Sequence, residues 1–321
     1  MAHLRELEER WDCRIVYFSQ DAIAPQAARN LSHKLKAAGT SLRWASDMRP
    51  EPGLTPEYCR ELKDGGALSI ALGIESGSPR VLELIHKGVS VQDMQTAVKN
   101  LAAAGIAVEA MCFTDFPSES AGEAEATLAF IASQRKQISL FICGRFGLSR
   151  GARAARFPAD YGIAKIWRLD GDELGTGLFY EECVPSKSDL ERQKIDQAID
   201  RLSTGWWLHA YPWAGALSTA HTLFWYARCG TDVFRRHADT PRRMAVKHPS
   251  PVRSARFDVQ RMMRVAAGRE AEIWHRLIYE DKAVSSRLYH RYSNAYPPQL
   301  PKINKRQPAR PRHTAKRPGR S

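Results

Sequence analysis

The stretch GIESGSPRVLELIHKG, residues 73–88, says most about the fold of this chain. It continues the apolar run of residues 67–74, which is typical of a buried strand, and its Ser-Pro pair predicts the start of a helix. A strand that leads into a helix is the unit of α/β proteins, whose ligands bind at the carboxyl ends of the strands. Glu75 and Ser76 stand at such an end, so we predict that they belong to a binding site.

Alternating strand and helix patterns extend from this stretch in both directions. The predicted strands are residues 14–18, 42–45, 68–74, 106–113 and 138–143, and the predicted helices are residues 2–10, 25–38, 56–65, 79–88, 90–105 and 120–133. Five strands separated by helices predict a parallel sheet with right-handed crossovers. Periodicity alone leaves both a doubly wound sheet and a barrel open.

The pattern changes after Gly144. Residues 146–163 are loop-like, and residues 170–182 predict a turn followed by a short edge strand. The chain then becomes helical: an amphipathic helix at 189–202, an aromatic-rich pair of short helices within 206–227, and a final helix near 270–280. We therefore predict three parts. They are an α/β domain with a rim segment (residues 1–186), a helical C-terminal region (187–300) and a tail (301–321).

The positive charge is concentrated in the tail. Residues 302–320 hold eight Lys or Arg and no acidic residue, so of the net charge of +13 only +5 belongs to the rest of the chain. The tail is rich in Pro and poor in apolar residues, which predicts disorder. Its charge is compatible with a nucleic-acid or acidic partner, but composition favours a solvated tail without a partner.

Composition also bears on compartment and metal content. A charged run follows Met1 directly, which argues against a secretory signal, and the uncharged stretch 206–227 contains two His and a Pro, which disfavours a membrane-spanning helix. No two of the six cysteines lie closer than 31 positions, so no local zinc or iron–sulfur motif is expected. Cys112 and Cys143 are predicted to be buried on neighbouring strands. We expect a cytoplasmic protein without membrane contact.

Several segments, taken in order, resemble the radical S-adenosylmethionine (radical SAM) superfamily, in particular the class often fused to a cobalamin-binding domain. They are FSQD (18–21), WASDMRPEPGLTPE (44–57), GIESGSPRVLELIHKG (73–88), AAAGIAVEAMCF (102–113) and FPSESAGEAEATLAFI (116–131). The resemblance covers about residues 10 to 150. It implies a partial (β/α) barrel of radical SAM type, with S-adenosylmethionine bound at the carboxyl edge of the strands.

The resemblance also implies roles for individual residues. Glu75 and Ser76 match the motif that contacts the methionine or ribose part of S-adenosylmethionine, and Asp21 and Arg49 would meet its amino and carboxylate groups. Phe113 and Pro117 lie near the adenine-side strand end, and Glu119 matches a glutamate before the next helix. Each has a plainer alternative, such as hydrogen bonds from helix amides alone for Glu75 and a rim ion pair for Arg49. The residues assign no catalytic group and no metal ligand.

Two departures from the family pattern matter. Asp115 stands where the family usually has Gly, and a side chain there would crowd the adenine or change the turn. The CxxxCxxC motif, whose thiolates hold a [4Fe–4S] cluster in the family, is absent. By strand count, Met1 falls in the helix that follows the first barrel strand, so we expect the first βα unit and its cluster loop to be missing.

Three functions remain open at this point. The first is a radical SAM-type protein that binds S-adenosylmethionine, with its cluster loop supplied by an upstream segment or a separate chain. The second is a catalytically inactive degenerate barrel that binds a small molecule or a partner. The third is a nucleic-acid binder that acts through the basic tail. A small-molecule or peptide substrate and the use of cobalamin stay unspecified.

Overall fold

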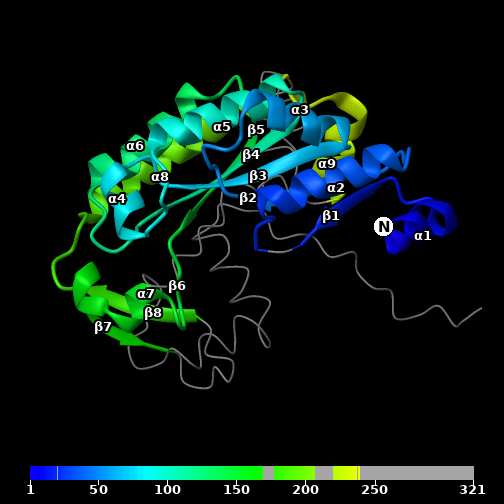
Figure 1. Cartoon of the computed structure of the whole chain (residues 1–321). Coiled ribbons are helices and arrows are strands. Elements are labelled where there is room, and N and C mark those ends of the chain that lie inside the picture. The colour runs from blue at the N-terminus through cyan, green and yellow to red at the C-terminus, as the bar shows by residue number, and fades with distance from the viewer. Residues whose placement is uncertain (20, 169–176, 207–219, 237, 239–321) are drawn as a thin grey trace, which may run out of the picture.

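A five-stranded parallel sheet forms the centre of the computed structural model, which describes residues 1–19, 21–168, 177–206, 220–236 and 238. Its strands are β1 (Ile15–Phe18), β2 (Arg43–Met48), β3 (Ala67–Glu75), β4 (Ala107–Thr114) and β5 (Ile138–Arg145), which pair in chain order (Figure 1). Every pairing is parallel, as the alternation of strands and helices predicted. The five predicted strands and their parallel pairing are confirmed. Pairing in chain order is that of a partial barrel and not that of a doubly wound sheet.

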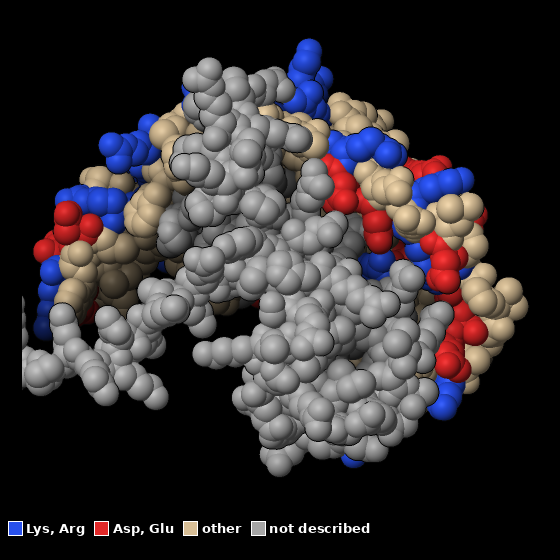
Figure 2. Space-filling view, turned by 180° about the vertical axis from the view of Figure 1, so that it is seen from behind, with Lys and Arg blue, Asp and Glu red and all other residues tan. Residues whose placement is uncertain are grey.

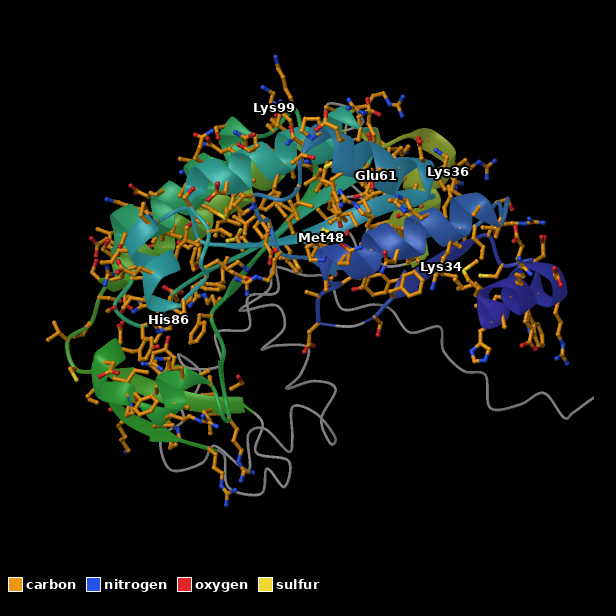
Figure 3. All side chains as sticks on the ribbon, in the orientation of Figure 1. Lys34, Lys36, Met48, Glu61, His86 and Lys99 are labelled. Atoms are coloured by element: carbon orange, nitrogen blue, oxygen red, sulfur yellow. The ribbon has the colours of Figure 1, made fainter. Side chains whose placement is uncertain are left out.

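Helices connect successive strands and form a layer over one face of the sheet (Figure 1). They are α2 (Pro25–Ala37), α3 (Pro56–Asp64), α4 (Pro79–Leu84), α5 (Val91–Ala103) and α6 (Ala121–Ser133), and α1 (Ala2–Trp11) precedes β1. Figure 3 shows Lys36, Glu61 and Lys99 projecting away from the sheet on this layer. The polar sides of these helices therefore face solvent, and their apolar sides face the strands.

Side-chain caps fix where several of these helices begin. Ser90 and Asp93 form a reciprocal capping box at α5, and Ser120 and Glu123 form another at α6. In each box the serine hydroxyl accepts from a backbone N–H three residues later, and the acidic side chain accepts from the serine N–H. Both helices therefore begin where these pairs stand.

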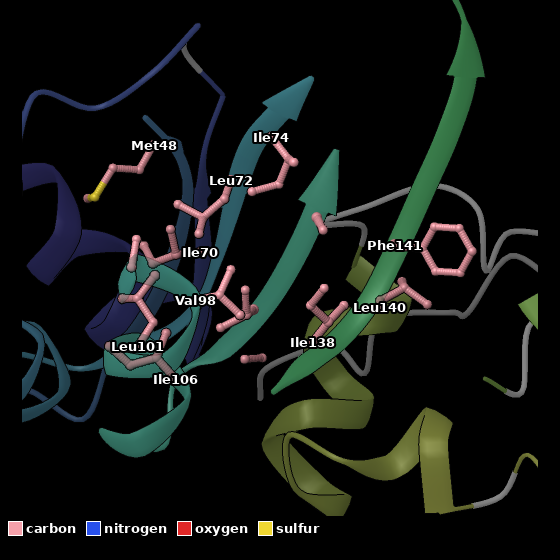
Figure 4. Packing of buried hydrophobic residues seen from close by; sticks show 14 of the residues in the cluster. Met48, Ile70, Leu72, Ile74, Val98, Leu101, Ile106, Ile138, Leu140 and Phe141 are labelled. Atoms are coloured by element: carbon pink, nitrogen blue, oxygen red, sulfur yellow. The ribbon is translucent and has the colours of Figure 1, made fainter. Parts of the chain in front are cut away.

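The main core lies between the sheet and the outer helices. Figure 4 shows Ile70 and Leu72 of β3 beside Val98 and Leu101 of α5, and all four are almost fully buried. Successive strand residues point to opposite faces, so Ser69, Ala71 and Gly73 face the other, concave side of the sheet.

Residues beyond 187 also pack on the sheet. The helices α8 (Asp189–Ser203), α9 (Ala220–Cys229) and α10 (Val233–Arg236) follow Ser188, and α8 contacts α6. Arg43 of β2 donates to the carbonyl of Ala227, which places α9 on the concave side. Trp206 is fully buried against Phe141, with ring centroids 4.9 Å apart, and belongs to the same core as the strands.

A second sheet of three antiparallel strands stands at the carboxyl edge of the first (Figure 1). Its strands are β6 (Leu148–Ser149), β7 (Ile163–Trp167) and β8 (Gly177–Glu182), with β8 in the middle. The prediction of an edge strand near residue 180 is therefore wrong, because β6 and β7 pair with both sides of β8. Residues 146–163, expected to be a loop, contain β6, the short helix α7 (Arg153–Arg156) and the 3-10 turn η1 (Pro158–Tyr161).

Other sequence-based expectations have different outcomes. Cys112 and Cys143 are register partners on β4 and β5 and are buried, as predicted. The first of the two aromatic-rich helices, the helix near 270–280 and the basic tail lie outside the described residues. Within the described ranges, no helix is both long enough and apolar enough to span a membrane.

Candidate functional site

The turn between β3 and α4 is held tightly against α6. The Ser76 hydroxyl lies 3.2 Å from the Thr127 hydroxyl and accepts from the Ser78 N–H at 3.1 Å. The Gly77 N–H donates to Thr127, and a Cβ on Gly77 would lie 2.5 Å from the Ala126 carbonyl oxygen. Ser76 is fully buried. Its hydroxyl therefore positions the turn, and Gly77 permits the close approach to α6.

Glu75 occupies the end of β3 in a left-handed conformation, with φ of 62°. Its carboxylate pairs with the Lys87 ammonium at 3.1 Å, and the two side chains are 30% and 10% exposed. A Cβ on Gly73 would lie 2.6 Å from the Glu75 carboxylate and 3.0 Å from the Lys87 nitrogen. Glycine at position 73 therefore makes room for this ion pair, which opens to solvent on the Glu75 side.

Arg49 joins the same group from the end of β2. Its guanidinium donates to the Lys87 carbonyl and lies 3.4 Å from the Glu51 carboxylate. The structure thus brings Glu75 and Arg49 to one edge through Lys87, a residue that sequence reasoning did not single out. Asp21 is exposed between β1 and α2, and no hydrogen bond or ion pair links it to this group.

The strand end of β4 carries an aromatic cluster. Phe113 is half-buried, and its ring centroid lies 6.0 Å from that of Phe116 and 5.6 Å from that of Phe146. Pro117 is buried in the following loop. Tyr161 of η1 and Tyr180 of β8 cover this cluster, in which Phe113 and Phe146 are only partly buried, so these two rings can meet a ligand.

Glu119 is fully buried beneath the same loop. Its carboxylate accepts from the Asp115 N–H at 2.6 Å and from the Lys187 ammonium at 3.0 Å. Burial raises the pKa of Glu119 above its usual value, and the charge of Lys187 opposes this shift. Lys187 is itself buried, so the pair ties the start of α8 to the β4 loop.

Asp115, expected to alter the turn, keeps the conformation that a glycine would adopt there. Its φ is 65°, and its carboxylate accepts from Arg192 of α8 at 2.9 Å. Lys187 and Arg145 lie 3.5 and 3.6 Å from the same carboxylate. Aspartate tolerates the left-handed region better than most residues. These cations direct its side chain toward α8.

The residues present do not fit a [4Fe–4S] cluster. Such a cluster needs closely placed thiolates, but Cys112 and Cys143 are buried within the sheet and Cys112 donates to the Ile142 carbonyl. Across the ranges that the structure describes, no three His, Cys, Asp or Glu side chains are grouped to hold a metal ion. The group at the β3 edge offers instead two carboxylates, of Glu75 and Glu51, and two cations, of Lys87 and Arg49. Groups of both signs suit a zwitterionic amino acid.

Comparison with known proteins supports the resemblance seen in the sequence. No family model matches the chain. A segment of 103 residues, 32% of this chain, is 33% identical to the uncharacterized methyltransferase PH0819 of Pyrococcus horikoshii and covers 22% of that protein. The chain thus matches about a fifth of that relative's length.

Solved structures of the radical SAM type share the fold. The apo form of OxsB, a cobalamin-dependent S-adenosylmethionine radical enzyme, aligns with a TM-score of 0.52 at 11% identity, over 92% of this chain and 47% of OxsB. OxsB with aqua-cobalamin bound aligns with a TM-score of 0.50 at 12% identity, over 91% and 48%. The chain therefore has the radical SAM type of fold and spans about half the length of that enzyme.

Proposed function

We propose that this chain is a radical SAM-type protein that binds S-adenosylmethionine at the carboxyl edge of β3 and β4. The observation that carries the proposal is the Glu75–Lys87 pair beside Gly73, with Arg49 bound to the Lys87 backbone. The carboxylate of Glu75 would accept from the ammonium of the methionine part, and the Lys87 and Arg49 cations would take its carboxylate. When bound, the cofactor supplies an activated methyl or adenosyl group.

The adenine side of the site would be the strand end of β4. Phe113 presents a half-buried ring there, and Phe116 stacks against it. Pro117 is buried in the loop that follows. An aromatic face provides a stacking surface for a planar base. Ser76 and Glu119 would act indirectly, by holding their loops in place. Both side chains are buried, and each has an oxygen that is hydrogen-bonded to a neighbouring side chain. Asp21 is exposed beyond β1 and is given no contact with the cofactor.

We propose radical chemistry only for a form of the protein in which further thiolates hold a [4Fe–4S] cluster. Because the described residues hold no group of three thiolates, a segment or a separate chain would have to provide the [4Fe–4S] cluster. Any use of cobalamin would likewise depend on that segment or chain, and no residue of the described ranges is assigned to it. A binding barrel without this chemistry would have the same cofactor site, so cofactor binding is tested first.

Isothermal titration of the full chain with S-adenosylmethionine tests the proposal. Replacing Glu75 with Gln keeps the shape of the side chain but removes its charge, so affinity should fall at least about tenfold. The matched control is Glu83→Gln, the same change at an exposed position of α4. Equal affinity in all three proteins, or no saturable binding to the wild-type chain, contradicts the proposal.

A further inference from the structure

The loop that follows β4, residues 115–119, holds two residues in the left-handed region. Asp115 has a φ of 65° and Ser118 a φ of 66°. Neither is a glycine, so the contacts around the loop have to offset the free-energy cost of this conformation. Residues held in this way are concentrated at ligand-binding loops and switch segments. This loop is therefore a candidate for a functional element.

Side chains from other elements bind the backbone of this loop. The Tyr180 hydroxyl of β8 donates to the Asp115 carbonyl at 2.9 Å, and the Ser118 N–H donates to the Glu182 carboxylate at 2.7 Å. Arg80 of α4 donates to the Ser118 carbonyl at 2.6 Å. The second sheet and α4 thus hold both left-handed residues by their main-chain groups.

The Asp115 carboxylate adds an anchor to α8. It accepts from Arg192 at 2.9 Å, and the cations of Lys187 and Arg145 lie 3.5 and 3.6 Å from it. The Asp115 side chain is only 14% exposed, and none of the three cations is more than 22% exposed. Water and salt screen such interactions less than those of surface charges. The carboxylate therefore couples the loop firmly to α8 and to the end of β5.

The three cations around Asp115 have further carboxylate partners. The pairs are Arg145 with Asp196, Lys187 with Glu119, and Arg192 with Glu182. With Asp115 included, the cluster contains three cations and four carboxylates, so it has no excess positive charge to attract an anionic ligand. Its interactions join elements of the protein to one another. The cluster is therefore suited to positioning the loop rather than to binding a ligand itself.

The loop carries part of the aromatic cluster at the end of β4. Phe116 follows Asp115 directly and is buried. Its ring stacks on that of Phe113, with centroids 6.0 Å apart, and meets that of Phe146 edge-on, with centroids 4.7 Å apart. Contacts between aromatic rings depend on their distance and orientation. A displacement of the loop would therefore also displace the two partly buried rings that can meet a ligand.

We propose that Asp115 is a positioning residue for the adenosyl part of S-adenosylmethionine. Through Arg192 and the other cations it fixes the loop that sets Phe116 against Phe113, and it does not touch the ligand itself. A glycine would adopt the same φ but could not bind α8. The inference rests on the proposed function, because it assigns recognition of the adenosyl part to the β4 loop. Recognition of the methionine part stays with the group at the β3 edge, so the two can be tested separately.

The experiment titrates the full chain with S-adenosylmethionine and with 5′-methylthioadenosine, which has the adenosyl part but not the amino acid. Asp115→Gly permits the left-handed backbone but removes the carboxylate, and Arg192→Gln removes the charge of its partner. Each variant should weaken the binding of both compounds by about tenfold. The double variant should lose little more than either single variant, because the two side chains act as one pair. Asp12→Gly is the matched control, since Asp12 is also left-handed, with a φ of 48°, and pairs with Arg14, but is exposed before β1.

Glu75→Gln, in contrast, should weaken the binding of S-adenosylmethionine alone. Circular dichroism establishes that each variant is folded, and Arg192→Gln provides a second test if Asp115→Gly is not. Reduced stability with unchanged affinity for 5′-methylthioadenosine would mean that Asp115 is merely structural, and would overturn the inference.

The two proposals can fail separately. If S-adenosylmethionine binding depends on Glu75 but not on Asp115, or if 5′-methylthioadenosine does not bind the wild-type chain, only the inference about Asp115 is refuted. If S-adenosylmethionine itself does not bind the wild-type chain, the proposed function is refuted, and the role of Asp115 with it.

Discussion

The candidate site owes its form to a few ion pairs at single residues. Lys87 connects Glu75 to Arg49, and Lys187 connects Glu119 to the start of α8. Sequence reasoning found the acidic partners because they stand at strand ends, but it missed both lysines. Lys87 follows Glu75 by twelve residues, within the quoted stretch, and Lys187 lies 68 residues beyond Glu119. Only the pair of Glu119 and Lys187 joins residues that are too far apart in the sequence for a local pattern to indicate it.

The Arg80–Glu123 pair gives a prediction for pH dependence. Hydrogen bonds from Arg80, together with those from Ser120 and Ser78, lower the pKa of Glu123 to about 2. A carboxyl with a lowered pKa adds stability above its unfolded-state pKa, and this stability is lost as pH falls through the folded-state value. With Arg80 half exposed, we expect about 1–2 kcal/mol, present at neutral pH and lost between about pH 4.5 and 2.

Urea unfolding at several pH values checks this prediction. Glu123→Gln should lower the free energy of unfolding at neutral pH and flatten its decline in acid. Glu125→Gln, an exposed change on the same helix, is the control. An unchanged acid profile in Glu123→Gln would show that Arg80 contributes no pH-dependent stability.

At the scale of elements, the sequence predicted the parallel sheet and its helices but not the second sheet. The helices that follow β2, β3 and β4 begin at recognisable caps, Thr55, Ser78 and Ser120, and the strands have apolar runs, so local patterns suffice for these elements. The pairing of β8 with both β6 and β7 depends on contacts between segments that are far apart in the chain. Strand β6 has only two residues, too few for any periodic pattern.

The β3–α4 turn offers a test of how elements hold the site. A methyl group on Gly77 would meet the α6 backbone, with an ideal Cβ 2.5 Å from the Ala126 oxygen. Gly77→Ala should therefore destabilise the chain by about 1–3 kcal/mol, because the turn must move away from α6. Chemical denaturation followed by circular dichroism measures the loss.

The control for that measurement is Gly53→Ala, since a Cβ there meets no atom within 4 Å. The displaced turn should also weaken S-adenosylmethionine binding in Gly77→Ala. Full stability in Gly77→Ala would mean that the close approach between the turn and α6 is not maintained in solution.

At the scale of the whole molecule, charge is distributed in two ways. Figure 2 shows acidic and basic side chains mixed on the described part of the face in view. The sequence, in contrast, places eight positive charges and no negative one in residues 302–320. Any nucleic-acid partner is therefore proposed for the tail, on the basis of charge alone.

Removing residues 302–321 tests that proposal. If the tail binds single-stranded nucleic acid through its eight charges, the logarithm of affinity should fall with the logarithm of salt concentration with a slope as steep as about −6. The shortened chain should lose both the binding and the slope. Fluorescence anisotropy with labelled single-stranded DNA measures both. Undiminished binding by the shortened chain would locate the interaction elsewhere, and no binding by the full chain would end the proposal.

The sequence by itself determined the alternation of strands and helices, the parallel order of the sheet and the strand end at which Glu75 stands. These features follow from hydrophobic period and helix capping, which act over a few neighbouring residues. Only the tertiary structure decided which charges meet. It joined Glu75 to Lys87 and Arg49 and directed Asp115 toward α8. Such pairings depend on the register of separate strands, because the alternation of side chains decides which groups share a face.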